Sequence, residues 1–168
     1  MKALLIFMLV GLVVQVNGVQ SSANRKTDLS GTWVLDRAKS EPKPTYEEST
    51  LTINYEEPAL TIHSYARSKD RGVKTQSTYY CDGRGEVDPV TELKSITRWK
   101  GDSLTISYQG PEYPSKRLMD TIEVWSISDQ GKRLTIKVYS QPAEGAEPAS
   151  SVSSSARRVF LWVYRRAS

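Results

Sequence analysis

The sequence predicts an all-β fold, an antiparallel up-and-down β-barrel of about 8–10 strands. From Leu29 onward, β-rich runs of about five to nine residues alternate with polar turn signals. No stretch after the N-terminal region shows the apolar period of an amphipathic helix. Strands that follow one another in a meander can close every edge by forming a barrel, which removes the exposed edges of an open sheet. A two-sheet sandwich is the alternative.

The N-terminus is predicted to be a cleavable signal peptide. Lys2 supplies a positive start, an apolar run follows from Ala3 to Val16, and small or polar residues come next. Cleavage after Gly18 is favoured over cleavage after Ala23, and both positions fit the small-x-small preference. The run of about 14 apolar residues is too short to span a bilayer as a helix, which needs about 20. We therefore expect a secreted or periplasmic chain with three parts: a signal peptide (1–18), a flexible segment (19–28) and a barrel domain (29–168).

Four strands are predicted before residue 82: residues 31–35, 50–55, 60–65 and 73–81. The second shows the alternation most clearly. Leu51, Ile53 and Tyr55 share one parity, whereas threonine and asparagine residues occupy the other, so one face is expected to be buried. Turns are indicated at residues 56–58 and 69–72.

Five further strands are predicted: residues 93–99, 103–108, 119–127, 133–139 and about 158–164. The dipeptide Gly101-Asp102 is a hairpin turn signal, and residues 128–131 form another. A loop is expected to open at Asp82. Residues 110–114, with two prolines, and residues 141–155, rich in Pro, Ala, Glu, Gly and Ser, are also predicted to be loops.

Charge and residue usage argue against several classes of function. The 23 Lys and Arg residues exceed the 19 Asp and Glu residues by a net charge of +4. Apart from four arginines near the C-terminus, the basic residues are scattered among acidic ones, so nucleic acid is not an expected partner. The outward strand faces carry polar residues such as Ser103, Thr105 and Ser107, rather than the apolar band of a membrane barrel. We expect no integral membrane segment in the mature chain.

The sequence also lacks the residues of a convincing catalytic or metal centre. Cys81 is the only cysteine, which excludes an intramolecular disulfide, and it is expected to be a half-buried, inert thiol. His63 is the only histidine and is expected to face solvent, so a histidine-cysteine metal site or a Ser-His-Asp triad is not predicted. The adjacent pairs Glu47-Glu48 and Glu56-Glu57 point to opposite strand faces and cannot act together. We expect no enzyme, no cofactor and no metal.

Several segments resemble secreted bacterial lipocalin-like proteins of the calycin type. Residues 29–36 and 38–40 look like the opening of that group, whose first strand carries a Gly-x-Trp motif, here Gly31-Thr32-Trp33. Segments similar to its later hairpins are residues 99–104, 123–125 and 129–134. The resemblance implies a barrel closed at one end by Trp33, with Arg165 or Arg166 stacked over the indole.

The candidate ligand-binding residues are Tyr55, Trp99, Tyr108, Glu123 and Trp125. Glu123 shares the parity of Trp125, so its carboxylate is buried if that face is interior; alternatively Ile122 and Val124 face inward and Glu123 lies in water.

Aromatic rings with a few hydroxyls would suit a small hydrophobic or amphipathic ligand, held without catalysis. The alternative is a packed barrel that acts as a structural or interaction domain and binds a protein partner in the cell envelope.

Overall fold

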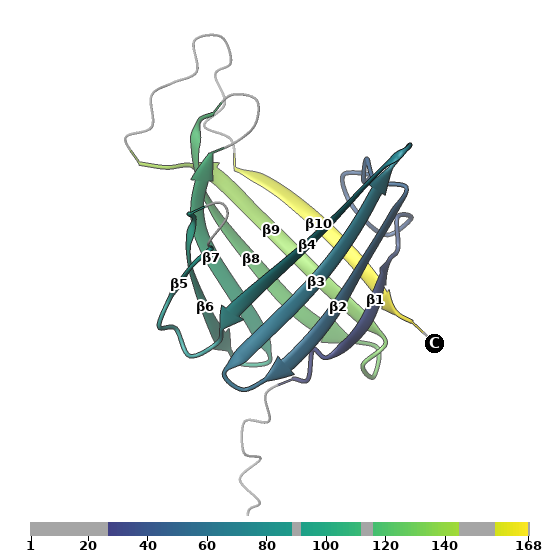
Figure 1. The fold of residues 1–168 in the computed structure, drawn as a ribbon, viewed down its shortest axis with the longest axis horizontal. Coiled ribbons are helices and arrows are strands. Elements are labelled where there is room, and N and C mark those ends of the chain that lie inside the picture. Colours follow the sequence, from purple (N-terminus) through teal and green to yellow (C-terminus); the bar gives the residue numbers. More distant parts are fainter. Residues whose placement is uncertain (1–26, 89–91, 112–115, 145–156, 168) are drawn as a thin grey trace, which may run out of the picture.

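The computed structural model describes residues 27–88, 92–111, 116–144 and 157–167. The predicted signal peptide (1–18) and most of the predicted flexible segment (19–28) lie outside these ranges. The described residues form ten antiparallel strands in a nearly closed barrel, as predicted (Figure 1). None of them belongs to a helix long and apolar enough to cross a membrane.

The strands have these bounds in chain order: β1 (Gly31–Leu35), β2 (Glu48–Glu56), β3 (Ala59–Ser68), β4 (Arg71–Tyr80), β5 (Glu86–Val87), β6 (Lys94–Lys100), β7 (Ser103–Pro111), β8 (Leu118–Ser128), β9 (Arg133–Pro142) and β10 (Arg158–Arg166). Each pairs with its neighbour in sequence except at one point. The first and last strands pair with each other, so the sheet order is β4-β3-β2-β1-β10-β9-β8-β7-β6-β5.

The barrel has a seam where β4 faces β5 and β6, so the prediction that every edge is closed is wrong. β4 and β5 are the two outer strands of the sheet, and β5 has only two residues. Between them the chain turns at Gly83 and Gly85, which both have positive φ angles. A single isolated bridge between Asp82 and Arg98 joins this turn to β6. A two-residue strand is too short to pair along β4.

The nine predicted strands are present, and several are longer than predicted. β5 lies in the region predicted to be a loop. β7 continues through Pro111 and β9 through Pro142, because both keep pairing with β8 through Leu118 and Met119. Ala143 and Glu144 follow β9 as irregular structure, and residues 112–114 and 145–155 of the predicted loops lie outside the described residues.

One end of the barrel is packed and the other is hollow. Inward positions near the packed end are large and apolar, and Leu60, Leu104 and Leu134 are fully buried there. Further along the same strands, the inward positions become small or polar. On β9, for example, Leu134 and Ile136 are followed by Val138 and Ser140. The change from leucine to serine leaves space inside the barrel.

Trp33 closes the packed end, and Arg166 lies over its indole ring. The guanidinium carbon is 4.4 Å from the ring centroid, close enough for cation–π attraction. Arg166 also donates hydrogen bonds to the carbonyl oxygens of Ser30 (2.9 Å) and Gly131 (2.8 Å). Trp33 is fully buried, and its Nε1 donates to the Leu29 carbonyl oxygen at 3.0 Å.

Arg165 and Gly31 lie next to the Trp33–Arg166 pair, and their positions show why the residue type matters at each site. Arg165, the other candidate, precedes Arg166 on a strand and therefore points to the opposite, exposed face. Gly31 has a φ of 129°, and a Cβ atom there would lie 2.6 Å from Nη1 of Arg166. The close approach of the arginine therefore requires glycine at position 31.

Candidate ligand-binding cavity

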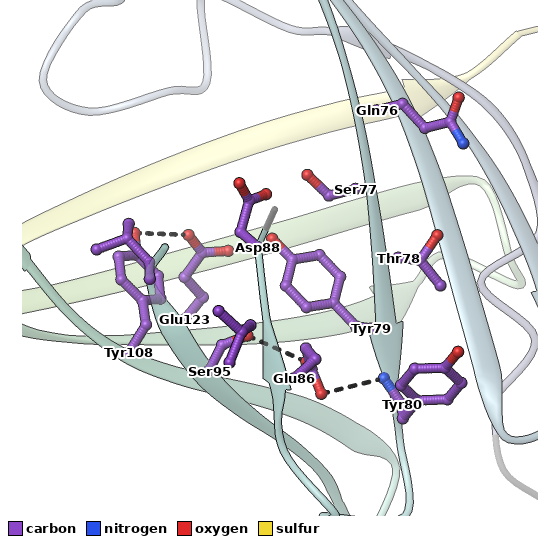
Figure 2. Close-up of a pocket in the computed structure, with 12 residues that line it drawn as sticks. Gln76, Ser77, Thr78, Tyr79, Tyr80, Glu86, Asp88, Ser95, Tyr108 and Glu123 are labelled. Carbon is purple, nitrogen blue, oxygen red and sulfur yellow. Dashed lines mark hydrogen bonds between the residues drawn. The ribbon is translucent and has the colours of Figure 1, made fainter. Parts of the chain in front are cut away.

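The main cavity has a volume of about 550 Å³ and lies at the seam between β4 and β5. Its lining comes from β4 to β8, so the residues are distant in sequence and are brought together by the barrel (Figure 2). The lining residues are Gln76, Ser77, Thr78, Tyr79, Tyr80, Glu86, Val87, Asp88, Leu93, Ser95, Tyr108 and Glu123.

Two smaller cavities adjoin the main one. A cavity of about 280 Å³ shares Leu93 and Tyr108 with it, and one of about 240 Å³ shares Ser77, Tyr79 and Glu123. The shared walls show that the hollow continues along the inside of the barrel. The space therefore has room for a ligand longer than the main cavity alone would hold.

Glu123 projects inward from β8 and forms the polar centre of the cavity (Figure 2). Its Oε1 accepts a hydrogen bond from Tyr108 Oη at 3.2 Å, and its Oε2 accepts one from Trp125 Nε1 at 2.8 Å. Protein surrounds the carboxyl group, although it keeps some accessible surface because it faces the cavity. Burial raises the pKa of Glu123, and the two hydrogen bonds oppose that shift only in part. Of the two orientations left open by the sequence, the inward one is found.

Two tyrosines beside Glu123 have raised pKa values. Burial, followed by the nearby Glu123, raises the pKa of Tyr79 to about 12. The same two causes also raise the pKa of Tyr108 above its usual value. Both phenols are therefore protonated at neutral pH and can donate hydrogen bonds, which is how Tyr108 contacts Glu123.

A second carboxylate, Glu86, lies on β5. Its Oε1 accepts hydrogen bonds from Ser95 Oγ (3.1 Å) and Thr97 Oγ1 (2.9 Å), and its Oε2 accepts a longer one from the Tyr80 backbone amide (3.4 Å). Glu86 and the nearby Asp88 were not among the predicted site residues, because this region was expected to be a loop. The inward hydroxyls at positions 95 and 97 were the available signal, since buried hydroxyls need an acceptor.

The predicted ligand-binding residues separate into two groups. Tyr108 and Glu123 line the main cavity, and Trp125 lines the smaller cavity that shares Glu123. Tyr55 and Trp99 instead contact each other: Trp99 Nε1 donates to Tyr55 Oη at 3.0 Å, and their ring centroids are 5.8 Å apart. Neither lines any of the three cavities, and both pack against the buried core. Ligand contact by the first three stays a prediction.

Similar architectures occur among solved structures. The "REP1-NXSQ fatty acid transporter" has a TM-score of 0.51 and 14% identity, covering 84% of this chain and 97% of that one. Fatty-acid-binding protein 1 of Echinococcus granulosus has a TM-score of 0.50 and 13% identity over 83% and 98% of the two chains. Secretory abundant heat soluble protein 4 of Ramazzottius varieornatus has a TM-score of 0.51 and 12% identity over 83% and 94%. The chain has a calycin-type barrel fold.

At these identities the likeness shows a shared fold. It fits the lipocalin-like barrel predicted from the sequence, whereas a bacterial and secreted origin stays a prediction. No protein-family model matches the sequence, and no curated protein sequence matches it.

Among the described residues, no three His, Cys, Asp or Glu side chains come close enough together to hold a metal ion. His63 faces solvent on β3, as expected. Cys81 is 5% exposed and is thus more deeply buried than predicted. The cavity is suited to holding and orienting a molecule through apolar rings and hydrogen bonds.

Proposed function

We propose that the protein is an exported carrier that binds a small hydrophobic or amphipathic molecule in the barrel without changing it chemically. The observation that carries this proposal is the cavity of about 550 Å³, in which three tyrosine rings and the aliphatic Val87 and Leu93 lie among polar side chains. Small-molecule sites commonly combine this volume with this lining. The names of two proteins with the same fold, a fatty acid transporter and a fatty-acid-binding protein, add support for binding an apolar molecule.

The packing of the barrel favours a carrier over a purely structural domain. β3 and β9 each bury a leucine completely at one end and present a cavity-lining serine, Ser64 or Ser140, further along. A structural barrel would gain stability from filling this space, because each buried CH₂ group contributes about 0.8 kcal/mol. Glu123, the central polar group there, accepts hydrogen bonds from Tyr108 and Trp125. This arrangement supports binding of a molecule without a chemical step.

A lipophilic fluorescent probe is expected to bind the purified protein. Nile red is suitable because it is uncharged and its emission rises in an apolar site. Binding is also expected to change tryptophan emission, since Trp125 and Trp162 line the cavity adjoining the main one. A titration that shows neither saturable probe binding nor any response of tryptophan emission would end the carrier proposal.

Two substitutions to phenylalanine test whether the probe binds inside or outside the barrel. Ser77 lines the main cavity and is cross-strand from the buried Ile62, so Ser77→Phe should fill the space and weaken binding about tenfold or more. His63→Phe adds a ring to the exposed face of the neighbouring strand and should leave binding unchanged. Equal binding by both variants would place the probe outside the cavity.

Export is the second part of the proposal and is supported by the N-terminal sequence pattern. Expression of the full chain in a secreting host should give a mature protein that begins at Val19, or at Asn24 if the second site is used. Intact-mass measurement of the protein recovered outside the cytoplasm distinguishes these products. Recovery of only the full-length chain, retained in the cytoplasm, would contradict export.

A further inference from the structure

The polar lining of the main cavity is acidic. Glu86, Asp88 and Glu123 all line it, and none of the described lining residues is a lysine, arginine or histidine (Figure 2). The described lining of this cavity therefore holds three acidic side chains and no basic one.

The protein contacts described for Glu123 and Glu86 come from uncharged donors. Tyr108 and Trp125 donate to Glu123, and Ser95, Thr97 and the Tyr80 backbone amide donate to Glu86. Such bonds satisfy the oxygen atoms but leave the charge without a counter-ion. A buried charge is stabilised most by an opposite charge, so an incoming cation would supply what these contacts do not.

Arg84 and Arg158 lie near the main cavity but do not line it. Arg84 lies over the outer part of this wall, 4.7 Å from the Tyr80 ring centroid, but it is paired with Asp82 and does not line the cavity. Arg158, at the exposed start of β10, lines the adjoining cavity of about 280 Å³. An anionic ligand would have to direct its head group to Arg158 and away from Glu123.

Aromatic rings add a second source of attraction for a cation. Tyr79 and Tyr108 stand on either side of Glu123 (Figure 2), and the faces of such rings attract ammonium groups. Leu93 and Val87 supply apolar surface in the same cavity for the rest of a ligand. The carboxylates are too dispersed to form a metal site among the described residues, which favours an organic cation.

We infer that the cavity selects a cationic amphiphile, a molecule with an alkyl or similar apolar body and an ammonium head directed at Glu123. This inference rests on the proposed carrier function and narrows its ligand class. It also separates this chain from the ligands in the names of the similar barrels, because a fatty-acid carboxylate would face Glu86, Asp88 and Glu123.

Three ligands with the same ten-carbon chain test the inference by displacement of Nile red at neutral pH. Decylammonium is expected to displace the probe at a concentration about tenfold or more below that needed for decanol, and decanoate should be the weakest. Equal displacement by all three would overturn the inference and leave the carrier function intact. Tightest binding of decanoate would overturn it in favour of a head group at Arg158. If Nile red itself does not bind, the carrier function fails first.

Substitutions identify the charge responsible. Glu123→Gln should abolish most of the preference for decylammonium over decanol, because it removes the central charge but keeps a group that can accept from Trp125. Asp88→Asn, at the wall of the cavity, should lower the preference by a smaller factor and serves if the first variant does not fold. Asp102→Asn removes one exposed carboxylate in the β6–β7 turn and should change nothing. An unchanged ratio in both cavity variants would overturn the inference.

Discussion

Replacing Trp33 by alanine is expected to destabilise the fold by about 3–5 kcal/mol, the range found for buried large-to-small aromatic substitutions. The side chain is completely buried at the packed end of the barrel, so its removal leaves a cavity that the paired strands β1, β2 and β10 cannot close. The substitution also removes the hydrogen bond to Leu29 and the ring beneath Arg166. For a domain of this size the melting temperature should fall by roughly 6–20 °C.

The contribution of the arginine can be separated from that of the ring. Arg166→Met keeps an apolar stem over the indole but loses the charge and the hydrogen bonds to Ser30 and Gly131. It should therefore lower the free energy of unfolding, measured in urea, by less than Trp33→Ala. If Trp33→Ala unfolds at the same urea concentration as the unaltered chain, the indole does not close the barrel.

The strands were predictable from the sequence because a strand with one buried face alternates apolar and polar residues. In β2, Leu51 and Ile53 are buried and the intervening Thr52 is exposed, as the pattern indicates. The same reasoning placed Glu123 on the face of Trp125 but could not decide which face of β8 was interior. The odd-numbered and the even-numbered positions of β8 both contain apolar residues. Only the pairing of β8 with β7 and β9 settles which set of positions faces the core.

The seam and half of the cavity were not predictable in this way. β5 has two residues, too few to show a period, and its position depends on pairing with Ser95 and Lys94 of the next strand. Glu86 thus looked like a loop residue, although it accepts hydrogen bonds from two hydroxyls. The extension of β7 through Pro111 was missed for a related reason: local propensity argued against a strand, and pairing with β8 outweighed it.

Glu123→Gln is expected to change how stability depends on pH. The carboxyl ionises near 4.5 in an unfolded chain, and burial raises its pKa in the folded protein. Between these two values the folded chain retains a proton that the unfolded chain has lost. The contribution of Glu123 to stability therefore falls as pH rises through this window and stays low above it. Glutamine has no such titration, so the variant should gain stability relative to the unaltered chain as pH rises from 4 to 8.

Urea unfolding of both proteins at several pH values measures this difference directly. Asp102→Asn is the control, because its carboxyl is exposed in a turn and its removal should not produce the same pH dependence. Tyr79, Tyr108 and Tyr164, whose phenols interact with Glu123, have raised pKa values and stay protonated across this range. A difference that is constant from pH 4 to 8 would show that Glu123 ionises as freely in the fold as in water. The cavity would then hold its carboxylate in contact with solvent, and a cationic ligand would gain far less from meeting it.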